Sequence, residues 1–139
     1  MTPAERSGPP DEKVTINLGP VDLGRVDLLV SEGVFSSRTD FIRTSVRRQL
    51  EDHEQLLQEV VTRKEFTVGF LYHTRADLER YRSKGERLHI KVIGVYKLGE
   101  GVTKQLVNDV LENVTVLGSL RGPKAVVDSM KKNTREAHP

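Results

Sequence analysis

The chain has no cysteine and no tryptophan among its 139 residues. Without cysteine, disulfide bonds, thiolate metal sites and thiol nucleophiles are excluded. Only four Phe and three Tyr are present, so a hydrophobic core must consist mainly of Val, Leu and Ile. No apolar run approaches the ~20 residues of a membrane-spanning helix, and the first residues lack the apolar segment of a signal peptide. We therefore expect a soluble protein of the cytoplasm.

Recognisable enzyme motifs are also missing. The sequence has no G-x-S-x-G, Walker loop or HExxH motif, and the glycines of residues 97–104 have the wrong spacing for a phosphate loop. The four histidines, His53, His73, His89 and His138, are far apart and lack the spacing of metal ligands. We predict no catalytic residue, no cofactor and no metal site.

The first half of the chain begins with one isolated strand pattern. Residues 1–12 contain three prolines and a glycine, which is typical of a flexible arm. Residues 13–18 then alternate polar and apolar side chains, as a strand does, and Gly19-Pro20 ends the pattern. A lone strand has unpaired backbone N–H and C=O groups. We predict that the partner is the same strand of a second copy, paired antiparallel about a two-fold axis.

Two helices are predicted after this strand. The first covers residues 21–32 and ends at Gly33, which suits the left-handed position after a helix. The second begins near Ser37, where Ser37 and Asp40 have the spacing of a capping box. It is predicted to extend to about residue 63, because apolar positions and His53 recur at 4-3-4-3 spacing. The predicted dimer core consists of Val14, Ile16, Leu18, Val26, Leu29, Phe41, Ile42, Val46 and Leu50.

The opposite face of the predicted ribbon consists of Lys13, Thr15 and Asn17 from each copy. A two-stranded ribbon fits the major groove of B-DNA, where Lys can bind guanine, Asn can bind adenine, and Thr can hydrogen-bond or touch a thymine methyl group. The simpler interpretation is that these three residues form the solvent-exposed face of a surface strand. The two helices that follow in order favour DNA recognition.

Residues 13–50 resemble the ribbon-helix-helix domain of the Arc/MetJ/CopG class, and especially CopG-family bacterial transcriptional regulators. The resemblance lies in the order of strand, helix, glycine turn and the second helix that opens with SSRTDFIR. It implies an obligate dimer, usually a repressor, that reads bases with Lys13, Thr15 and Asn17. It also implies phosphate contacts at Ser36, Ser37, Arg38 and Thr39, and the start of a helix favours phosphate on electrostatic grounds as well. Ser37 could instead serve only as the helix cap.

The second half of the chain follows another pattern. Three short apolar stretches centre on Gly69, Gly94 and Gly118, and helical patterns follow at residues 75–83, 103–112 and 124–130. This periodicity predicts three strand–helix units around a parallel sheet. Coincidence, or a compact α+β domain such as an ACT-like sandwich, remains the alternative.

Together these patterns predict an α+β protein with an arm at 1–12, a ribbon-helix-helix domain at 13–63, an α/β domain for oligomerisation or sensing at 64–131, and a flexible tail at 132–139. The predicted function is a sequence-specific DNA-binding transcriptional regulator, with repression as the expected mode. Its predicted partners are double-stranded DNA and further copies of itself, as a homodimer or a larger oligomer. Two alternatives stay open: the antitoxin of a toxin–antitoxin pair, and a DNA-organising or partition protein that assembles through its C-terminal domain.

Overall fold

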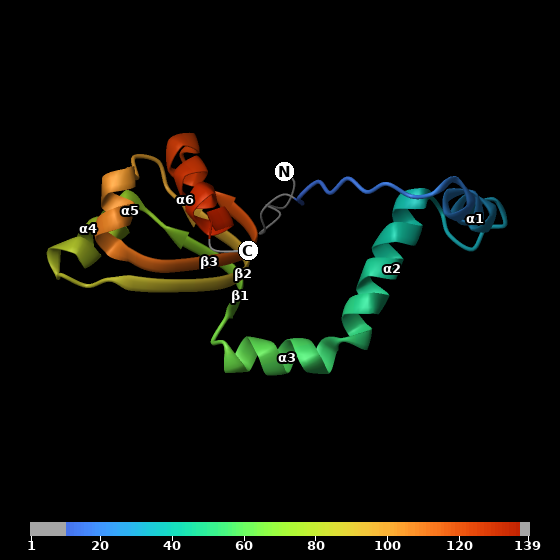
Figure 1. Ribbon diagram of the computed structural model, residues 1–139, viewed down its shortest axis with the longest axis horizontal. Helices are drawn as coiled ribbons and strands as arrows, with labels where there is room; N and C mark the ends of the chain where they lie inside the picture. The colour runs from blue at the N-terminus through green and yellow to red at the C-terminus, as the bar shows by residue number, and fades with distance from the viewer. Residues whose placement is uncertain (1–10, 137–139) are drawn as a thin grey trace, which may run out of the picture. The chain divides into compact units, whose positions relative to one another are not determined.

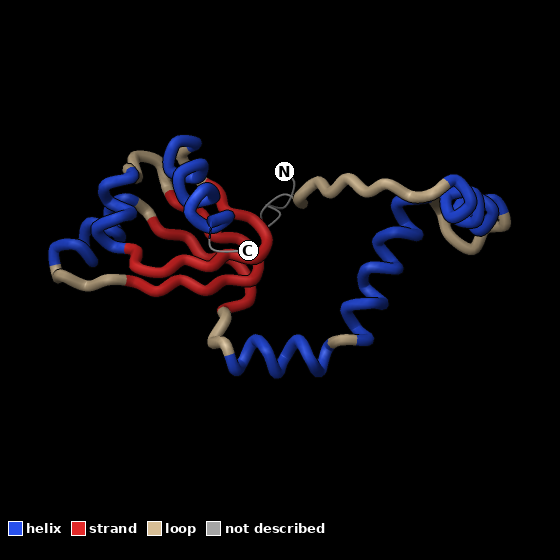
Figure 2. Tube along the Cα trace, viewed as in Figure 1, coloured by secondary structure: helices blue, strands red, loops and turns tan. Residues whose placement is uncertain are grey.

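The computed structural model describes residues 11–136, and the chain divides into two compact units. The N-terminal unit is Lys13–Lys64; in the described residues the C-terminal unit combines 65–136 with Asp11 and Glu12. Most of the predicted arm, residues 1–10, and the last three residues of the predicted tail lie outside the described residues. Figures 1 and 2 show the helices and strands of each unit.

The first helix of the N-terminal unit is bounded by a proline and a glycine. Helix α1 (Pro20–Ser31) has proline at its first position, where the fixed φ of proline suits a helix and its missing N–H is not needed. At the other end Gly33 has φ 80°. Its N–H donates to the Val30 carbonyl at 3.1 Å, and the Val34 N–H donates to the Leu29 carbonyl at 3.0 Å. This is a Schellman motif, so the predicted glycine stop is confirmed.

The second predicted helix is in fact two helices, α2 (Arg38–Asp52) and α3 (Glu54–Arg63). The interruption is at His53, whose backbone has φ −109° and ψ 11°. His53 Nδ1 lies 2.8 Å from the Gln49 carbonyl oxygen, and its backbone N–H donates to the Leu50 carbonyl instead. The imidazole thus takes the carbonyl that the His53 backbone N–H would bind in a continuous helix. The prediction of one continuous helix to residue 63 is wrong for this reason.

The predicted strand at residues 13–18 is not formed in the single chain. Residues 11–19 have no regular secondary structure, and all of them are exposed to solvent. A strand requires hydrogen bonds to a neighbouring strand, and the only sheet in the described residues belongs to the C-terminal unit. The intermolecular ribbon stays a prediction.

The C-terminal unit contains three strand–helix units, as the glycine periodicity predicts. Its sheet is parallel with the order β1-β2-β3, which differs from the ACT-like alternative. Helix α5 is shorter than predicted because β3 starts at Leu111, and α6 extends into residues predicted as a tail. The elements are β1 (Thr67–His73), α4 (Arg75–Ser83), β2 (Leu88–Leu98), α5 (Lys104–Val110), β3 (Leu111–Arg121) and α6 (Lys124–Glu136).

The three helices of this unit lie against one face of the sheet (Figure 1). Crossovers between successive parallel strands are almost always right-handed. Because each new strand is added at the same edge of the sheet, in the order β1-β2-β3, right-handed crossovers keep the helices on one face. Tyr96 and Leu98 on β2, Leu78 on α4 and Val110 on α5 are almost completely buried between these layers. The opposite face, called here the open sheet face, leaves large apolar side chains in solvent: Val68, Phe70, Tyr72 and Leu117.

The three repeated glycines form a row across the sheet. Gly69 pairs with Gly94 and Gly94 with Gly118, with φ values of 132°, 134° and 123°. A Cβ atom on Gly94 would lie 2.1 Å from the Gly69 carbonyl oxygen, and one on Gly118 would lie 2.2 Å from the Gly94 oxygen. Only glycine allows this backbone conformation and this close approach, which explains the recurrence in the sequence.

Gly94→Ala is expected to destabilise the C-terminal unit by about 3 kcal/mol or more, because it combines a strained φ with a backbone clash. Gly24→Ala is the matched control, since a Cβ on Gly24 has nothing within 4 Å and alanine favours a helix. Thermal unfolding followed by circular dichroism measures both variants. Equal stability of the two variants would contradict the packing described for the glycine row.

Candidate nucleic-acid interface

The predicted ribbon segment has two chemically different faces. Lys13, Thr15 and Asn17 alternate with apolar residues, and every one of these side chains is exposed in the single chain. Val14 and Ile16 keep 79% and 52% of their surface exposed. Apolar side chains that alternate with polar ones and remain in water are typical of a strand that lacks the layer it packs on.

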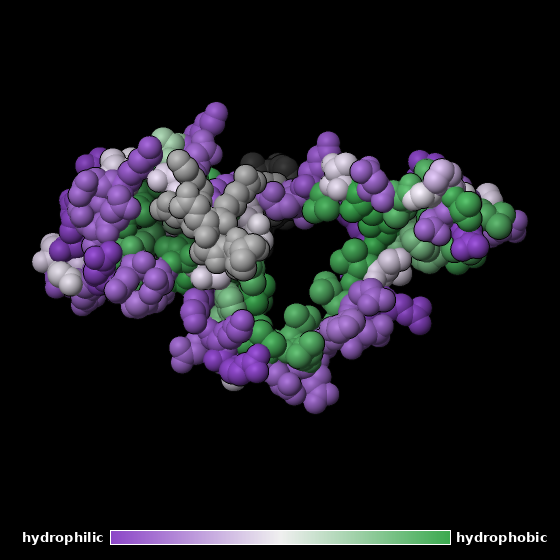
Figure 3. Space-filling model, viewed as in Figure 1, coloured by the Kyte–Doolittle hydropathy of each residue, from purple (hydrophilic) through white to green (hydrophobic). Residues whose placement is uncertain are grey.

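The interior of the N-terminal unit is small. Among residues 13–64, all of which the structure describes, Val26 is the only buried residue. Phe41 and Ile42 are half-buried, and the rings of Phe35 and Phe41 meet edge to face at 5.0 Å. Figure 3 shows hydrophobic surface along α2 and α3. The exposed apolar residues of the three helices include Leu28, Leu29, Val46, Leu50, Leu56 and Leu57.

The start of α2 is capped by its own side chains. The Asp40 N–H donates to Ser37 Oγ at 3.0 Å, so Ser37 is the helix cap as its spacing predicts. The Asp40 carboxylate accepts a hydrogen bond from the Ser36 N–H at 3.0 Å, one residue earlier than in a standard capping box. That backbone hydrogen bond lowers the pKa of Asp40 below its ordinary value. Of the four predicted phosphate-binding residues, Ser36 and Ser37 therefore already have local partners.

Arg38 links the two first helices. Its Nε and Nη2 atoms donate to the Asp27 carboxylate of α1 at 2.7 and 2.8 Å. The hydrogen bonds from Arg38 lower the pKa of Asp27. Asp27 was not predictable as a partner of Arg38, because it lies eleven positions earlier, a separation that does not correspond to any helical spacing. Arg38 and Thr39 are both exposed at the start of α2, so two of the predicted phosphate contacts face solvent.

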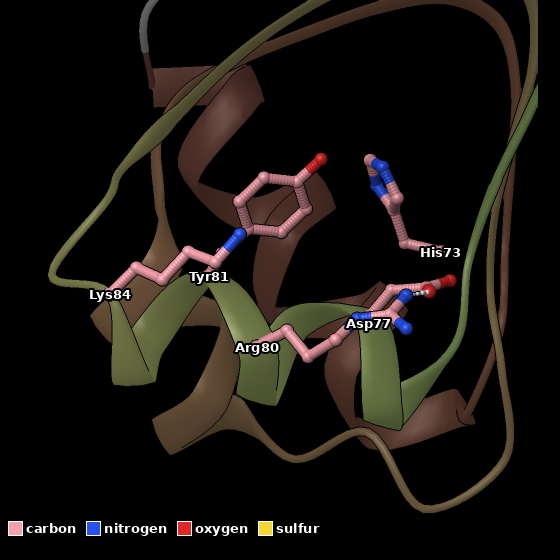
Figure 4. Close-up of a pocket in the computed structure, with 5 residues that line it drawn as sticks. All are labelled: His73, Asp77, Arg80, Tyr81 and Lys84. Atoms are coloured by element: carbon pink, nitrogen blue, oxygen red, sulfur yellow. Dashed lines mark hydrogen bonds and ion pairs between the residues drawn. The ribbon is translucent and has the colours of Figure 1, made fainter.

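The C-terminal unit has a small cavity of about 280 Å³ beside α4. His73 and Tyr81 project toward it, and Arg80 pairs with the Asp77 carboxylate (Figure 4). His73 Nδ1 lies 2.7 Å from the Tyr96 hydroxyl, and burial lowers the pKa of His73, partly offset by the charge of Asp77. His73 thus belongs to the packing between sheet and helix. No group of three possible metal ligands occurs in the described residues, and His138 lies outside them.

Comparison with models of protein families identifies the family of this chain. The model of the Ribbon-Helix-Helix transcriptional regulator family matches residues 9–127, which covers both units. Comparison with curated proteins and with solved structures gives no match. No helix in the described part of the chain is long and apolar enough to cross a membrane. The chain belongs to the Ribbon-Helix-Helix transcriptional regulator family, which indicates a DNA-binding regulator.

Proposed function

We propose that the protein is a dimeric repressor that reads the major groove with a two-stranded antiparallel ribbon, formed by residues 13–18 of two copies. The observation that carries this proposal is the small interior of the N-terminal unit, where Val26 alone is buried. A unit of this size needs more buried apolar surface to be stable. A second copy supplies it, because Val14, Ile16 and Leu18 of the paired strands then cover the apolar sides of α1 and α2.

The polar face of the ribbon supports base recognition. Pairing about a two-fold axis brings Lys13, Thr15 and Asn17 of both copies into a narrow double row. Lys and Asn offer hydrogen bonds to guanine and adenine edges, and Thr adds a hydroxyl and a methyl group. A ribbon inserted into the major groove of a half-site at a promoter would block transcription by occupying it.

Arg38 supports the orientation of the ribbon on the duplex. Asp27 holds two of the three guanidinium nitrogens, and the third, Nη1, can donate to a phosphate oxygen beside the start of α2. This arrangement fixes the position of a long side chain before DNA arrives, which reduces the entropy lost on binding. Thr39, exposed in the same turn, offers a hydroxyl to the same phosphate.

Arg38→Gln is expected to weaken binding to all DNA sequences alike, because phosphate contacts carry no sequence information. Two copies each lose one contact, so the slope of log affinity against log salt concentration should decrease in magnitude by about 2. Fluorescence anisotropy at several salt concentrations measures this slope. Arg63→Gln at the end of α3 is the matched control and should leave the slope unchanged. A change in sequence preference with an unchanged slope would contradict the phosphate role.

The open sheet face supports assembly beyond the dimer. Val68 and Phe70 keep 67% and 53% of their surface exposed, and they are neighbours on one face of β1. An apolar sheet face with no covering layer is typical of an interaction surface. We expect the C-terminal units to join dimers into larger oligomers suited to tandem half-sites. Analytical ultracentrifugation that detects nothing larger than a dimer at high concentration would contradict this.

Sequencing of the genomic DNA fragments that the purified protein selects tests the proposed function. The expected result is a two-fold symmetric motif found at one or two promoters. Sites distributed widely over a genome would favour the DNA-organising or partition alternative, for which the open sheet face is the supporting observation. The antitoxin alternative is disfavoured because the C-terminal unit has its own buried core, whereas antitoxin segments that bind toxins are usually short and disordered. Rapid proteolysis of residues 65–131 in the isolated protein would restore that alternative.

A further inference from the structure

A second, larger cavity lies where the three strands of the C-terminal unit end. Its volume is about 810 Å³, within the range of small-molecule sites. Because the strands are parallel, their carboxyl ends meet at one edge of the sheet, and the loops that follow the strands surround the cavity there. We call it the carboxyl-end cavity; it is lined by the residues that follow β1 (74–76), by the end of β2 and its loop (97–101), and by Gly122-Pro123 after β3, together with Tyr72.

Glycine backbone forms much of the wall of this cavity. A Cβ on Gly122 would lie 3.0 Å from the Leu98 carbonyl oxygen, and one on Gly101 would lie 3.2 Å from Arg75 Cδ. Gly101 and Gly122 also have φ values of 81° and 151°, which side chains rarely adopt. Side chains at these positions would meet Leu98 and Arg75, so glycine lets the loop after β3 approach Leu98 and the loop after β2 approach Arg75.

The side chains at this cavity favour a negatively charged ligand. Arg75 and Lys97 are two cations in its lining, against one carboxylate, Glu100. The Lys97 amine lies 5.6 Å from the centre of the Tyr72 ring. Arg75 Nε donates to Glu79 Oε1 at 2.9 Å, which holds the guanidinium in place and offsets part of its charge. Lys97 is also the register neighbour of Arg121 on β3, whose Nη2 lies 2.5 Å from Glu12 Oε1. Because Glu12 pairs with Arg121, Lys97 is the cation of this strand pair that lines the cavity.

The start of α4 does not provide this site by itself. The hydroxyl of Thr74 already accepts the Asp77 N–H, and the Asp77 carboxylate accepts the Thr74 N–H. The capping box thus satisfies these backbone donors with a carboxylate of the chain itself. Recognition of an anion must come from the cationic side chains and from the loops after β2 and β3.

We propose that the carboxyl-end cavity binds a small molecule that carries a phosphate or carboxylate group, with Arg75 and Lys97 as its charged contacts. Arg75 can bind two oxygens of either group at once, and Lys97 contributes a mobile point charge. Binding itself does not depend on the proposed DNA contacts. Any effect of this ligand on DNA binding would rest on the proposed function.

The test is a titration of the ¹⁵N-labelled full-length protein with inorganic pyrophosphate and, separately, with citrate, at constant ionic strength. The expected result is saturable movement of the amide signals of Gly99, Gly101 and Gly122 with at least one probe. The double variant Arg75→Gln, Lys97→Gln should bind that probe about tenfold more weakly, as loss of charge-assisted hydrogen bonds predicts. The titration is made without DNA, so its result is separate from that of the site selection.

Arg82→Gln, Lys91→Gln is the matched control. It removes the same two charges from α4 and β2 at positions that do not line the cavity. This control should keep the affinity of the unmodified protein. Absence of saturable shifts with both probes would overturn the proposal. An equal loss of affinity in the two double variants would also overturn it, because the effect would then be one of overall charge.

Discussion

The triple variant Lys13→Ala, Thr15→Ala, Asn17→Ala is expected to lose sequence-selective DNA binding and to keep the fold of the dimer. In the proposed ribbon these side chains face away from the apolar core, and they are exposed in the single chain. Each good base contact contributes roughly 1–3 kcal/mol of discrimination, and a dimer loses three contacts from each copy. Selective affinity should fall by roughly 10³-fold or more, until only non-specific binding remains. Anisotropy with the selected site and with a scrambled site measures the difference.

A second triple variant separates base reading from a general loss of polar surface. Gln58→Ala, Thr62→Ala, Arg63→Ala removes an amide, a hydroxyl and a cation from exposed positions of α3. It should retain the preference for the selected site. If the ribbon variant also retained that preference, the assignment of Lys13, Thr15 and Asn17 to base contacts would be refuted.

Sequence periodicity was most informative where the backbone itself demands one residue type. The glycine row was predictable because positive φ angles, and the clash that a Cβ would make with a neighbouring carbonyl oxygen, exclude every other residue at Gly94 and Gly118. Gly33 at the end of α1 was predictable from its positive φ alone. At these positions a single backbone requirement determines that the residue is glycine, so the requirement can be recognised from the sequence.

Other structural features depend on contacts that cannot be inferred from the spacing of residues in the sequence. The interruption at His53 results from one hydrogen bond between its ring and the Gln49 carbonyl, while the 4-3-4-3 pattern continues across it. The pairing of Arg38 with Asp27 depends on how α1 and α2 pack. The carboxyl-end cavity assembles loops from three separate repeats. The position of this cavity follows from the parallel strand order, but its cations could be identified only once the loops were placed.

Ile16→Asp is expected to abolish the dimer and the cooperative unfolding of the N-terminal unit. In a single chain half of the Ile16 surface is in water, so a carboxylate there would cost little. In the proposed dimer Ile16 is covered by helices of both copies, and each copy would bury a carboxylate with no partner. Such burial costs several kcal/mol per group. Analytical ultracentrifugation gives the oligomeric state, and amide hydrogen exchange shows whether the C-terminal unit keeps its own fold.

Thr15→Asp is the matched control, because it places the same charge one position earlier on the opposite face of the strand. It should leave the dimer intact and abolish DNA binding through repulsion from the phosphates. The two variants together determine the register of the ribbon, since a shift of one residue would exchange its faces. If Thr15→Asp dissociated the dimer and Ile16→Asp did not, residues 14, 16 and 18 would have to face the DNA. The base-reading assignment would then be wrong even in a dimeric protein.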